Sequence, residues 1–393
     1  MTWFKEQQAL QKQYASVNVL IVDDIAQMRE TVRSMLRAYG YSSLFLADSA
    51  NQALGLIGSK SIDMVITDWS MPNMPGIELV KKVKNDPKLF TIPMLMISDE
   101  RTMDKVLYAI EEGVDSFLVK PFSEQELIKH VKLLFRKIKN VDEIEEQVFE
   151  MRRMKLSNQY REALELGYKI LNKRNHPRVV LMLCECLYHV KEYDKAMDMM
   201  LDSEEESRSS EHNNLLGKIY LKLGKHDQGI LYLEQAVNKN GLNQDRKIDL
   251  ARAYVSVGRV DEAERVVSSI MNSKPTDLNL VDIAQLYLDM GEVDKAGFYL
   301  DQTVDPIPET VSVFNNYAIA LRKADRYEES ASIYKRCLQI TPDSGILHYN
   351  LGFLLTRLGR LTEAKTVLQK ALKLNPEDLH AKSLLQKVNE QLH

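Results

Sequence analysis

VLIVDDIAQMRETV, residues 19–32, decides the fold of the first part of this chain. Four apolar residues lead directly into two aspartates, and an amphipathic stretch follows over Ala26–Ala38. A short apolar run that passes into a helical pattern is typical of a strand followed by a helix. The two aspartates therefore stand at the C-terminal end of a predicted strand.

The same alternation continues to about residue 139. Turn residues separate the apolar runs, and a further amphipathic stretch spans Thr102–Glu112. The predicted strands are Val19–Val22, Ser43–Leu46, Met64–Thr67, Ile92–Ile97 and Ser116–Val119. Five strands that alternate with helices predict a doubly wound α/β domain, in which a parallel sheet is covered by helices on both faces.

Polar side chains end four of these strands. Asp23 and Asp24 end the first strand and Asp68 ends the third, and strand C-termini of a parallel sheet gather at one edge. Three carboxylates in one pocket repel each other and need either protonation or a cation, for which Mg²⁺ is suited by its preference for oxygen ligands. Ser98 and Lys120 end the fourth and fifth strands, where a hydroxyl and an ammonium suit a phosphoryl group. Asp68 is the predicted nucleophile, because carboxylates form aspartyl phosphates.

Four segments carry a family resemblance. They are VLIVDDIAQMRETV (19–32), ITDWSMPNMPGIEL (66–79), PMLMISDE (93–100) and VDSFLVKPF (114–122). They resemble the response-regulator receiver family, especially its chemotaxis-type members. The resemblance covers about residues 17–140 and implies a flavodoxin-like sheet with strand order 2-1-3-4-5.

The resemblance also implies a role for each site residue. Asp68 would accept a phosphoryl group from a histidine kinase or a phosphotransfer protein, with assistance from Lys120 and Ser98. Ser98 and Phe117 would form the switch pair that responds to phosphorylation. The implied Mg²⁺ ligands are Asp23, Asp24, Asp68 and the backbone carbonyl of Ser70.

A repeat begins after residue 140, where the strand patterns end. Small residues recur every 33 or 34 positions at Ala163, Ala196, Gly229, Ala263, Ala296, Ser330 and Ala364. Prolines recur at Pro275, Pro308, Pro342 and Pro376, and glycines at Gly224, Gly258, Gly291 and Gly359. A small residue lets two helices approach closely, a glycine permits a turn with positive φ, and a proline ends a helix. The pattern resembles the tetratricopeptide repeat family.

The predicted organisation is an N-terminal helix at 1–16, a receiver domain at 17–140, about seven repeats at 141–377 and a capping helix at 378–393. Such repeats stack into a superhelix with an extended binding surface. The resemblance places these candidate groove residues on it: Lys218, Lys222, Arg252, Arg322, Tyr349, Phe353 and Arg357. We expect an unidentified protein or peptide to bind there. A homodimer is a further option, through apolar residues of the N-terminal helix.

Bulk composition narrows the function classes. The formal net charge is −4, and the part after residue 140 carries 34 basic and 39 acidic residues. This balance disfavours nucleic acid as a partner, because phosphate backbones attract basic proteins. No apolar run of about 18 residues and no signal-peptide pattern are present, and three cysteines suit a reducing compartment. We therefore expect a cytoplasmic protein without a membrane partner.

These observations predict a two-component response regulator in which phosphorylation of Asp68 switches a repeat-based protein-interaction output. It would not be an enzyme beyond its own phosphorylation and hydrolysis, since no catalytic constellation follows residue 140. The alternative is a constitutive repeat scaffold whose receiver no longer signals. Failure to bind Mg²⁺ or to accept phosphate would favour the scaffold.

Overall fold

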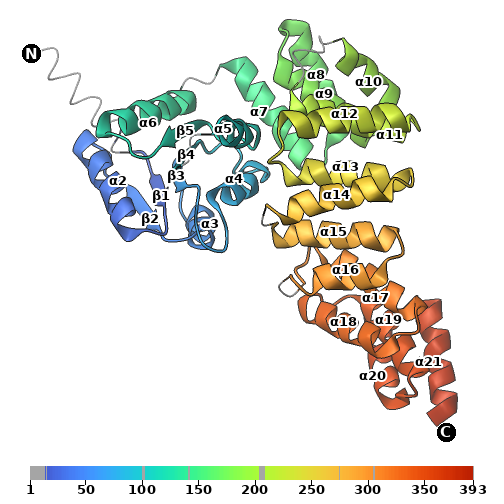
Figure 1. The fold of residues 1–393 in the computed structure, drawn as a ribbon. Coiled ribbons are helices and arrows are strands. Elements are labelled where there is room, and N and C mark those ends of the chain that lie inside the picture. The colour runs from blue at the N-terminus through green and yellow to red at the C-terminus, as the bar shows by residue number, and fades with distance from the viewer. Residues whose placement is uncertain are drawn as a thin grey trace, which may run out of the picture. The chain divides into compact units, whose positions relative to one another are not determined.

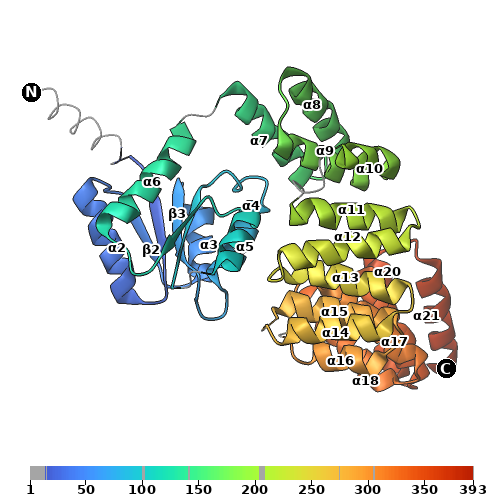
Figure 2. The ribbon, with the colours of Figure 1, turned by 45° about the horizontal axis from the view of Figure 1, so that its top comes forward.

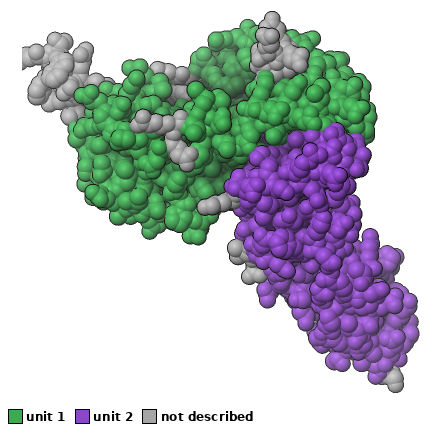
Figure 3. Space-filling view, viewed as in Figure 1, with its two compact units in different colours: residues 1–243 green, residues 244–393 purple. Residues whose placement is uncertain are grey.

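The computed structural model describes residues 14, 16–99, 102–139, 142–202, 209–273, 275–303 and 306–392. Its contacts divide the chain into two compact units, residues 1–243 and 244–393 (Figure 3). Most of the predicted N-terminal helix at 1–16 and the junction at residues 140–141 lie outside the described residues. The domain boundaries drawn from the sequence stay predictions.

Five parallel strands form one sheet of order β2-β1-β3-β4-β5, which is the predicted order (Figure 1). They are β1 (Val19–Val22), β2 (Leu44–Ala47), β3 (Met64–Asp68), β4 (Met94–Ser98) and β5 (Ser116–Val119). The fourth strand was predicted to begin at Ile92 and begins two residues later. Pro93 lacks the N–H that a central strand must donate, so the ladder starts after it.

Helices cover both faces of the sheet (Figure 2). One face packs against α2 (Ala26–Tyr39) and α6 (Glu124–Lys139), and the other against α3 (Ala50–Ser59), α4 (Gly76–Lys84) and α5 (Met103–Glu111). Within β1, Val19 and Ile21 join the first core and Leu20 and Val22 join the second. Successive strand side chains point to opposite faces, and both faces are buried here, so the strand is apolar throughout.

The rest of the described chain is helical and built from pairs of contacting helices. In the first unit the pairs are α7 (Glu143–Leu156) with α8 (Tyr160–Lys173), α9 (Pro177–His189) with α10 (Tyr193–Leu201), and α11 (Ser210–Lys222) with α12 (His226–Lys239). In the second unit they are α13 (Gln244–Ser256) with α14 (Val260–Met271), α15 (Asp277–Asp289) with α16 (Val293–Leu300), α17 (Val311–Lys323) with α18 (Tyr327–Ile340), and α19 (Gly345–Arg357) with α20 (Leu361–Leu374). Helix α21 (Leu379–Leu392) follows, and no helix in the described part of the chain is long and apolar enough to cross a bilayer.

Each pair turns through one residue with positive φ. These residues recur every 33 or 34 positions, at Asn158, Lys191, Gly224, Gly258, Gly291, Asp325 and Gly359. Glycine adopts this conformation freely, while Asn and Asp tolerate it better than other residues do. Lys191 keeps the turn at φ 66° although the sequence lacks the glycine there. The period therefore extends through the first two pairs, where the sequence pattern is weakest.

The recurring small residue lies where the two helices of a pair touch. Ala163, Ala196, Ala296 and Ala364 are fully buried, and so is Ser330. The Ser330 hydroxyl donates a hydrogen bond of 2.6 Å to the Ala318 carbonyl, so its polar atom is satisfied inside the core. The predicted reason for small residues at this position, close approach of two helices, agrees with this burial.

Candidate functional site

The carboxyl ends of three strands gather an ammonium and two carboxylates. Asp23 follows β1, Asp68 ends β3 and Lys120 follows β5. The Lys120 Nζ lies 2.5 Å from Asp68 Oδ1 and 3.6 Å from Asp23 Oδ2. Each of the three side chains is at most 10% exposed. The sheet order places β1 next to β3, so the two carboxylates meet at the switch in strand order.

Burial shapes the charge of this cluster. It raises the pKa of the Asp23 carboxyl, and the negative charges of Asp68 and Asp24 raise it further against the opposing Ile25 N–H and Lys120. Burial also disfavours the Lys120 ammonium, but its hydrogen bond to Asp68 and the nearby carboxylates outweigh that effect and raise the Lys120 pKa. Lys120 therefore stays charged, while burial disfavours the charged form of the Asp23 carboxyl.

Backbone groups hold the other carboxylate oxygen of Asp68. The Ser70 N–H donates to Asp68 Oδ2 at 2.8 Å. The Trp69 N–H donates to the Ile97 carbonyl at 2.8 Å, and the Gly76 N–H donates to the Trp69 carbonyl at 2.9 Å. These bonds tie the loop after β3 to β4 and to the start of α4, so both oxygens of Asp68 have fixed partners.

The predicted metal ligands Asp23, Asp24 and Asp68 stay a prediction. Asp24 is exposed, and among the described residues no three His, Cys, Asp or Glu side chains are grouped to hold a metal ion. Lys120 lies between Asp23 and Asp68 instead. The donor chemistry fits a hard cation, because Asp23 offers buried carboxylate oxygens beside Asp68.

The predicted switch pair lies on adjacent strands beside the acceptor. Ser98 ends β4 and is buried, and its carbonyl accepts the Lys120 N–H at 2.8 Å. Phe117 in β5 is half-buried, and its ring centroid lies 6.4 Å from that of Trp69. Trp69, the residue directly after Asp68, thus contacts Phe117, the predicted switch residue.

The sequence interpretation missed a chain of contacts that leads away from Asp68. The Trp69 ring lies 6.3 Å from the ring of Tyr108 in α5. Lys81 Nζ lies 5.7 Å from the Tyr108 ring and 4.0 Å from Glu112 Oε1. Tyr108 is buried, which raises the pKa of its hydroxyl. The one signal in the sequence for this series of contacts is Trp69, an aromatic residue directly after Asp68.

The end of α5 is bound by polar residues of the helical pairs in the same unit. Glu111 accepts hydrogen bonds from Ser210 and Asn240, and Glu112 Oε1 accepts from Asn243 Nδ2 at 2.9 Å. Leu242 packs against the core formed by α3, α4 and α5. The segment after α12 is therefore attached to the receiver face that contains α5.

Arg152 makes a second attachment, from α7. Its Nη2 donates to the Lys84 carbonyl at 3.1 Å, and its guanidinium lies 5.2 Å from the Phe90 ring centroid. The Phe149 ring adds an edge contact with Phe90 at 6.2 Å. Burial lowers the pKa of Arg152, although nearby carboxylates such as Glu185 and Asp115 oppose this.

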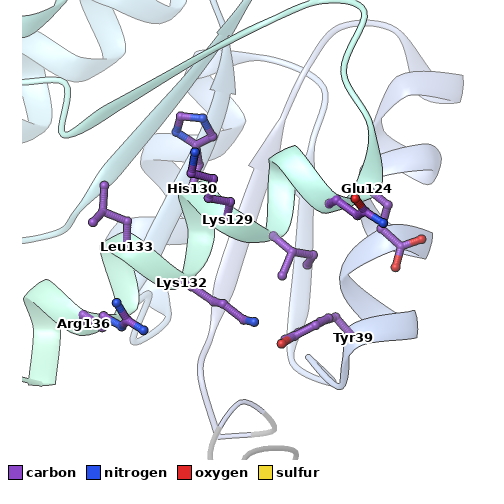
Figure 4. Close-up of a pocket in the computed structure, with 9 residues that line it drawn as sticks. Tyr39, Glu124, Lys129, His130, Lys132, Leu133 and Arg136 are labelled. Carbon is purple, nitrogen blue, oxygen red and sulfur yellow. The ribbon is translucent and has the colours of Figure 1, made fainter.

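A pocket lies on the other helical face, between Tyr39 of α2 and α6 (Figure 4). Lys132 Nζ lies 4.6 Å from the Tyr39 ring centroid, and Leu133 is exposed beside it. Lys129 and Arg136 add positive charge to the lining. The pocket contains neither Asp68 nor Lys120, so it belongs to a different surface from the carboxylate cluster.

The predicted groove residues fall in both units. Lys218 and Lys222 belong to α11 of the first unit, and the other five belong to the second. Arg252 forms an ion pair with Asp282, so its charge is already compensated. The groove stays a prediction.

Comparison with known proteins agrees with the fold. Residues 19–132 match the response regulator receiver domain family, and residues 220–282 and 321–388 match the tetratricopeptide repeat family. Residues 157–236 match the family described as anaphase-promoting complex, cyclosome, subunit 3. Together, fold and site define a receiver domain followed by helical repeats. The chain belongs to the response regulator receiver family.

Individual relatives are chemotaxis proteins. The chain is 35% identical to chemotaxis protein CheY of Pseudomonas aeruginosa over 122 residues, 31% of this chain and 98% of that protein. It is 35% identical to CheY-3 of Vibrio cholerae over 123 residues, 31% of this chain and 95% of that protein. The solved structure of CheY4 of Vibrio cholerae is 31% identical and covers 30% of this chain and 98% of its own, with a TM-score of 0.29. Receiver domains generally bind Mg²⁺, and a receiver joined to repeats is typical of regulators that are not enzymes.

Proposed function

We propose that this protein is a two-component response regulator whose phosphorylation at Asp68 controls a repeat-based interaction with a partner protein. The supporting observation is the buried cluster in which Lys120 Nζ contacts both Asp68 and Asp23. A phosphoryl group that reaches this edge finds a carboxylate nucleophile and a cation in one site.

The phosphoryl donor is a phosphohistidine of a histidine kinase or phosphotransfer protein. An Asp68 oxygen attacks phosphorus, the new P–O bond forms as the P–N bond breaks, and the electron pair leaves with the imidazole nitrogen. Lys120 neutralises charge on the transferred oxygens, and the Ser70 N–H and Ser98 hydroxyl provide hydrogen bonds. Asp23, Asp24, Asp68 and the Ser70 carbonyl would hold Mg²⁺. This ion supplies further positive charge when bound.

The donor protein docks near α2, where the pocket beside Tyr39 offers one surface for it. Lys129, Lys132 and Arg136 give this surface a positive charge, and Leu133 gives it an exposed apolar contact. Glu124 is the one acidic residue of the lining against these three basic ones, and an excess of positive charge favours fast encounter with a protein of opposite charge. Acetyl phosphate is a small donor and needs no such surface. A change in this surface should therefore slow labelling by the donor protein and leave labelling by acetyl phosphate unchanged.

The output runs through the contacts that lead from Asp68 to the helical pairs. Phosphorylation adds roughly one negative charge at residue 68 and changes the surroundings of Trp69 and Phe117. Trp69 contacts Tyr108, and Lys81 connects Tyr108 to Glu112, which binds Asn243. A local charge change can bias a packed element with two arrangements, and α5 is that element in this proposal.

Radiolabelling of the full chain by acetyl phosphate with Mg²⁺ tests the proposed function. A Mg²⁺-dependent label that is stable in acid and lost in alkali, as acyl phosphates are, supports it. If no label forms at any Mg²⁺ concentration, the constitutive scaffold is the better description of the chain.

Asp23→Asn is expected to separate stability from function. The raised pKa shows that the folded protein disfavours the charged carboxyl, so wild-type stability falls as pH rises from the ordinary aspartate pKa through the raised one. The neutral amide avoids this loss and is expected to stabilise the domain at pH 7 by about 1 kcal/mol. The same change should raise the Mg²⁺ concentration needed for half-maximal labelling by about tenfold or more.

Thermal unfolding at pH 4 and at pH 7, followed by tryptophan fluorescence, measures the stability difference. The gain should be larger at pH 7 than at pH 4. A variant that is less stable than wild type at pH 7 would contradict the claim that the charged Asp23 carboxyl destabilises the fold. An unchanged Mg²⁺ dependence would remove Asp23 from the proposed metal ligands.

The double change Asn240→Ala and Asn243→Ala is expected to uncouple the helical pairs from the acceptor. Both amides bind the acidic end of α5, so their loss frees that helix. Helix α5 contacts Trp69, the residue next to Asp68, so a freed helix should alter the surroundings of the phosphoryl group. We therefore expect the half-life of the Asp68 phosphoryl group to change by about threefold or more. Asn272→Ala, at another helix end, is the matched control, since Asn272 is exposed and follows α14. Equal half-lives in wild type and double variant would disprove the route.

A further inference from the structure

The first helices of the pairs in the second unit differ sharply in charge. Helix α15 contains three aspartates and no Lys or Arg, whereas α17 and α19 together contain three basic residues and no Asp or Glu. These helices are neighbours, since Asn316 donates to Gln285 at 2.9 Å and Asn350 donates to Asn315 at 3.3 Å (Figure 1). Acidic and basic segments therefore lie side by side on one run of helices.

Two of the basic residues meet on one aromatic ring. The Arg322 guanidinium lies 5.1 Å from the Phe353 ring centroid, and the Arg357 guanidinium lies 5.6 Å from it. Phe353 and Arg322 are half-buried, and Arg357 is exposed. We call Arg322, Phe353 and Arg357 the Arg–Phe site. The ring attracts both cations, which brings two like charges together at a partly desolvated place.

Several other arginines of this unit have carboxylate partners. Arg252 pairs with Asp282, Arg326 with Asp294 and Glu329, and Arg360 with Glu328 and Glu363. Within the described residues of 244–393, Arg322 and Arg357 form no ion pair with any carboxylate. The Arg–Phe site thus offers guanidinium donors whose planar shape matches a carboxylate.

We propose that the Arg–Phe site binds an acidic segment of a partner protein. A partner carboxylate binds between the two guanidiniums, and a neighbouring apolar side chain packs on Phe353. A long polyanion fits poorly, because the chain after residue 140 carries 39 acidic against 34 basic residues. The proposal names the partner class for the output and so rests on the proposed function.

Fluorescence anisotropy of the full chain tests this without phosphorylation, so its failure leaves the phosphoacceptor proposal untouched. The probe is the labelled peptide Gly-Glu-Phe-Glu-Glu-Leu-Gly, and its analogue with Gln for each Glu is the comparison. We expect about tenfold tighter binding of the acidic peptide, weakening as salt rises from about 50 to about 300 mM. The double change Arg322→Gln and Arg357→Gln is expected to remove about tenfold of this affinity.

Lys335→Gln with Lys370→Gln is the matched control, because it removes the same charge from exposed positions on α18 and α20. The double change Arg322→Lys and Arg357→Lys keeps the charge and should restore only part of the affinity. Equal binding of the two peptides would overturn the proposal. So would an equal loss of affinity in the Arg322→Gln, Arg357→Gln variant and in the Lys335→Gln, Lys370→Gln control, or tighter binding of a labelled oligothymidylate than of the acidic peptide.

Discussion

Asp68→Asn is expected to reduce labelling by acetyl phosphate or by a phosphorylated donor protein by about 100-fold or more, to background. The amide is nearly the same size as the carboxylate and can still accept the Ser70 N–H, so the site should keep its shape. It lacks the charged oxygen that attacks phosphorus. It also leaves Lys120 without its closest partner, at 2.5 Å. If the label is lost while the domain stays folded, the cause is therefore the loss of the nucleophile and not unfolding.

Asp104→Asn is the matched control for this variant. Asp104 is exposed in the first turn of α5, and the same chemical change there should leave labelling within about twofold of wild type. Circular dichroism and thermal unfolding confirm that both variants fold. Persistent acyl-phosphate labelling of Asp68→Asn would show that another residue accepts the phosphoryl group, and the proposed function would then lose its central residue.

Gly76→Ala is expected to destabilise the receiver by about 3 kcal/mol or more and to slow labelling strongly. A Cβ built on Gly76 would lie 1.9 Å from the Asp68 carbonyl oxygen and 3.0 Å from Thr67 Oγ1. The nearest obstacle is backbone and cannot rotate away. Either α4 or the strand end that carries Asp68 must move, which disturbs the acceptor and its hydrogen bond to Ser70.

Gly55→Ala provides the control, in the middle of α3. A Cβ added to Gly55 would meet no atom within 4 Å, so alanine should stabilise the helix by about 0.5–1 kcal/mol. Urea unfolding followed by the fluorescence of Trp69 measures both changes in the same domain. A Gly76→Ala midpoint at or above that of wild type would show that the close approach at Asp68 is not a constraint on this position.

The sequence sufficed for the strand ends and for the repeat period because both depend on local chemistry. Apolar runs followed by Asp or Lys place charges at strand C-termini, and parallel strands bring those ends to one edge. Asp23, Asp68 and Lys120 lie together at this edge. Asp24 follows Asp23 directly, but both lie beyond the end of β1, where the alternation of a strand no longer sets the direction of a side chain, so its exposed position required the structure.

Longer contacts were beyond the sequence for a different reason. Glu112 and Asn243 are 131 positions apart, and no local pattern marks either residue as a partner of the other. Turn residues show the same limit on a smaller scale. Asn158, Lys191 and Asp325 adopt the positive φ that the sequence reveals only at glycines. Packing of the paired helices imposes the positive φ at the turn, and residues other than glycine can occupy that position.

By itself, the sequence determined the order of strands and helices, the phosphoacceptor candidate and the repeat of 33 or 34 residues, because each follows from neighbouring residues and their preferred conformations. Only the tertiary structure decided that Lys120 lies between two carboxylates, that Asn243 binds the end of α5 and that Arg322 and Arg357 share the Phe353 ring. Such pairings depend on how separate elements pack, and packing is a property of the whole core.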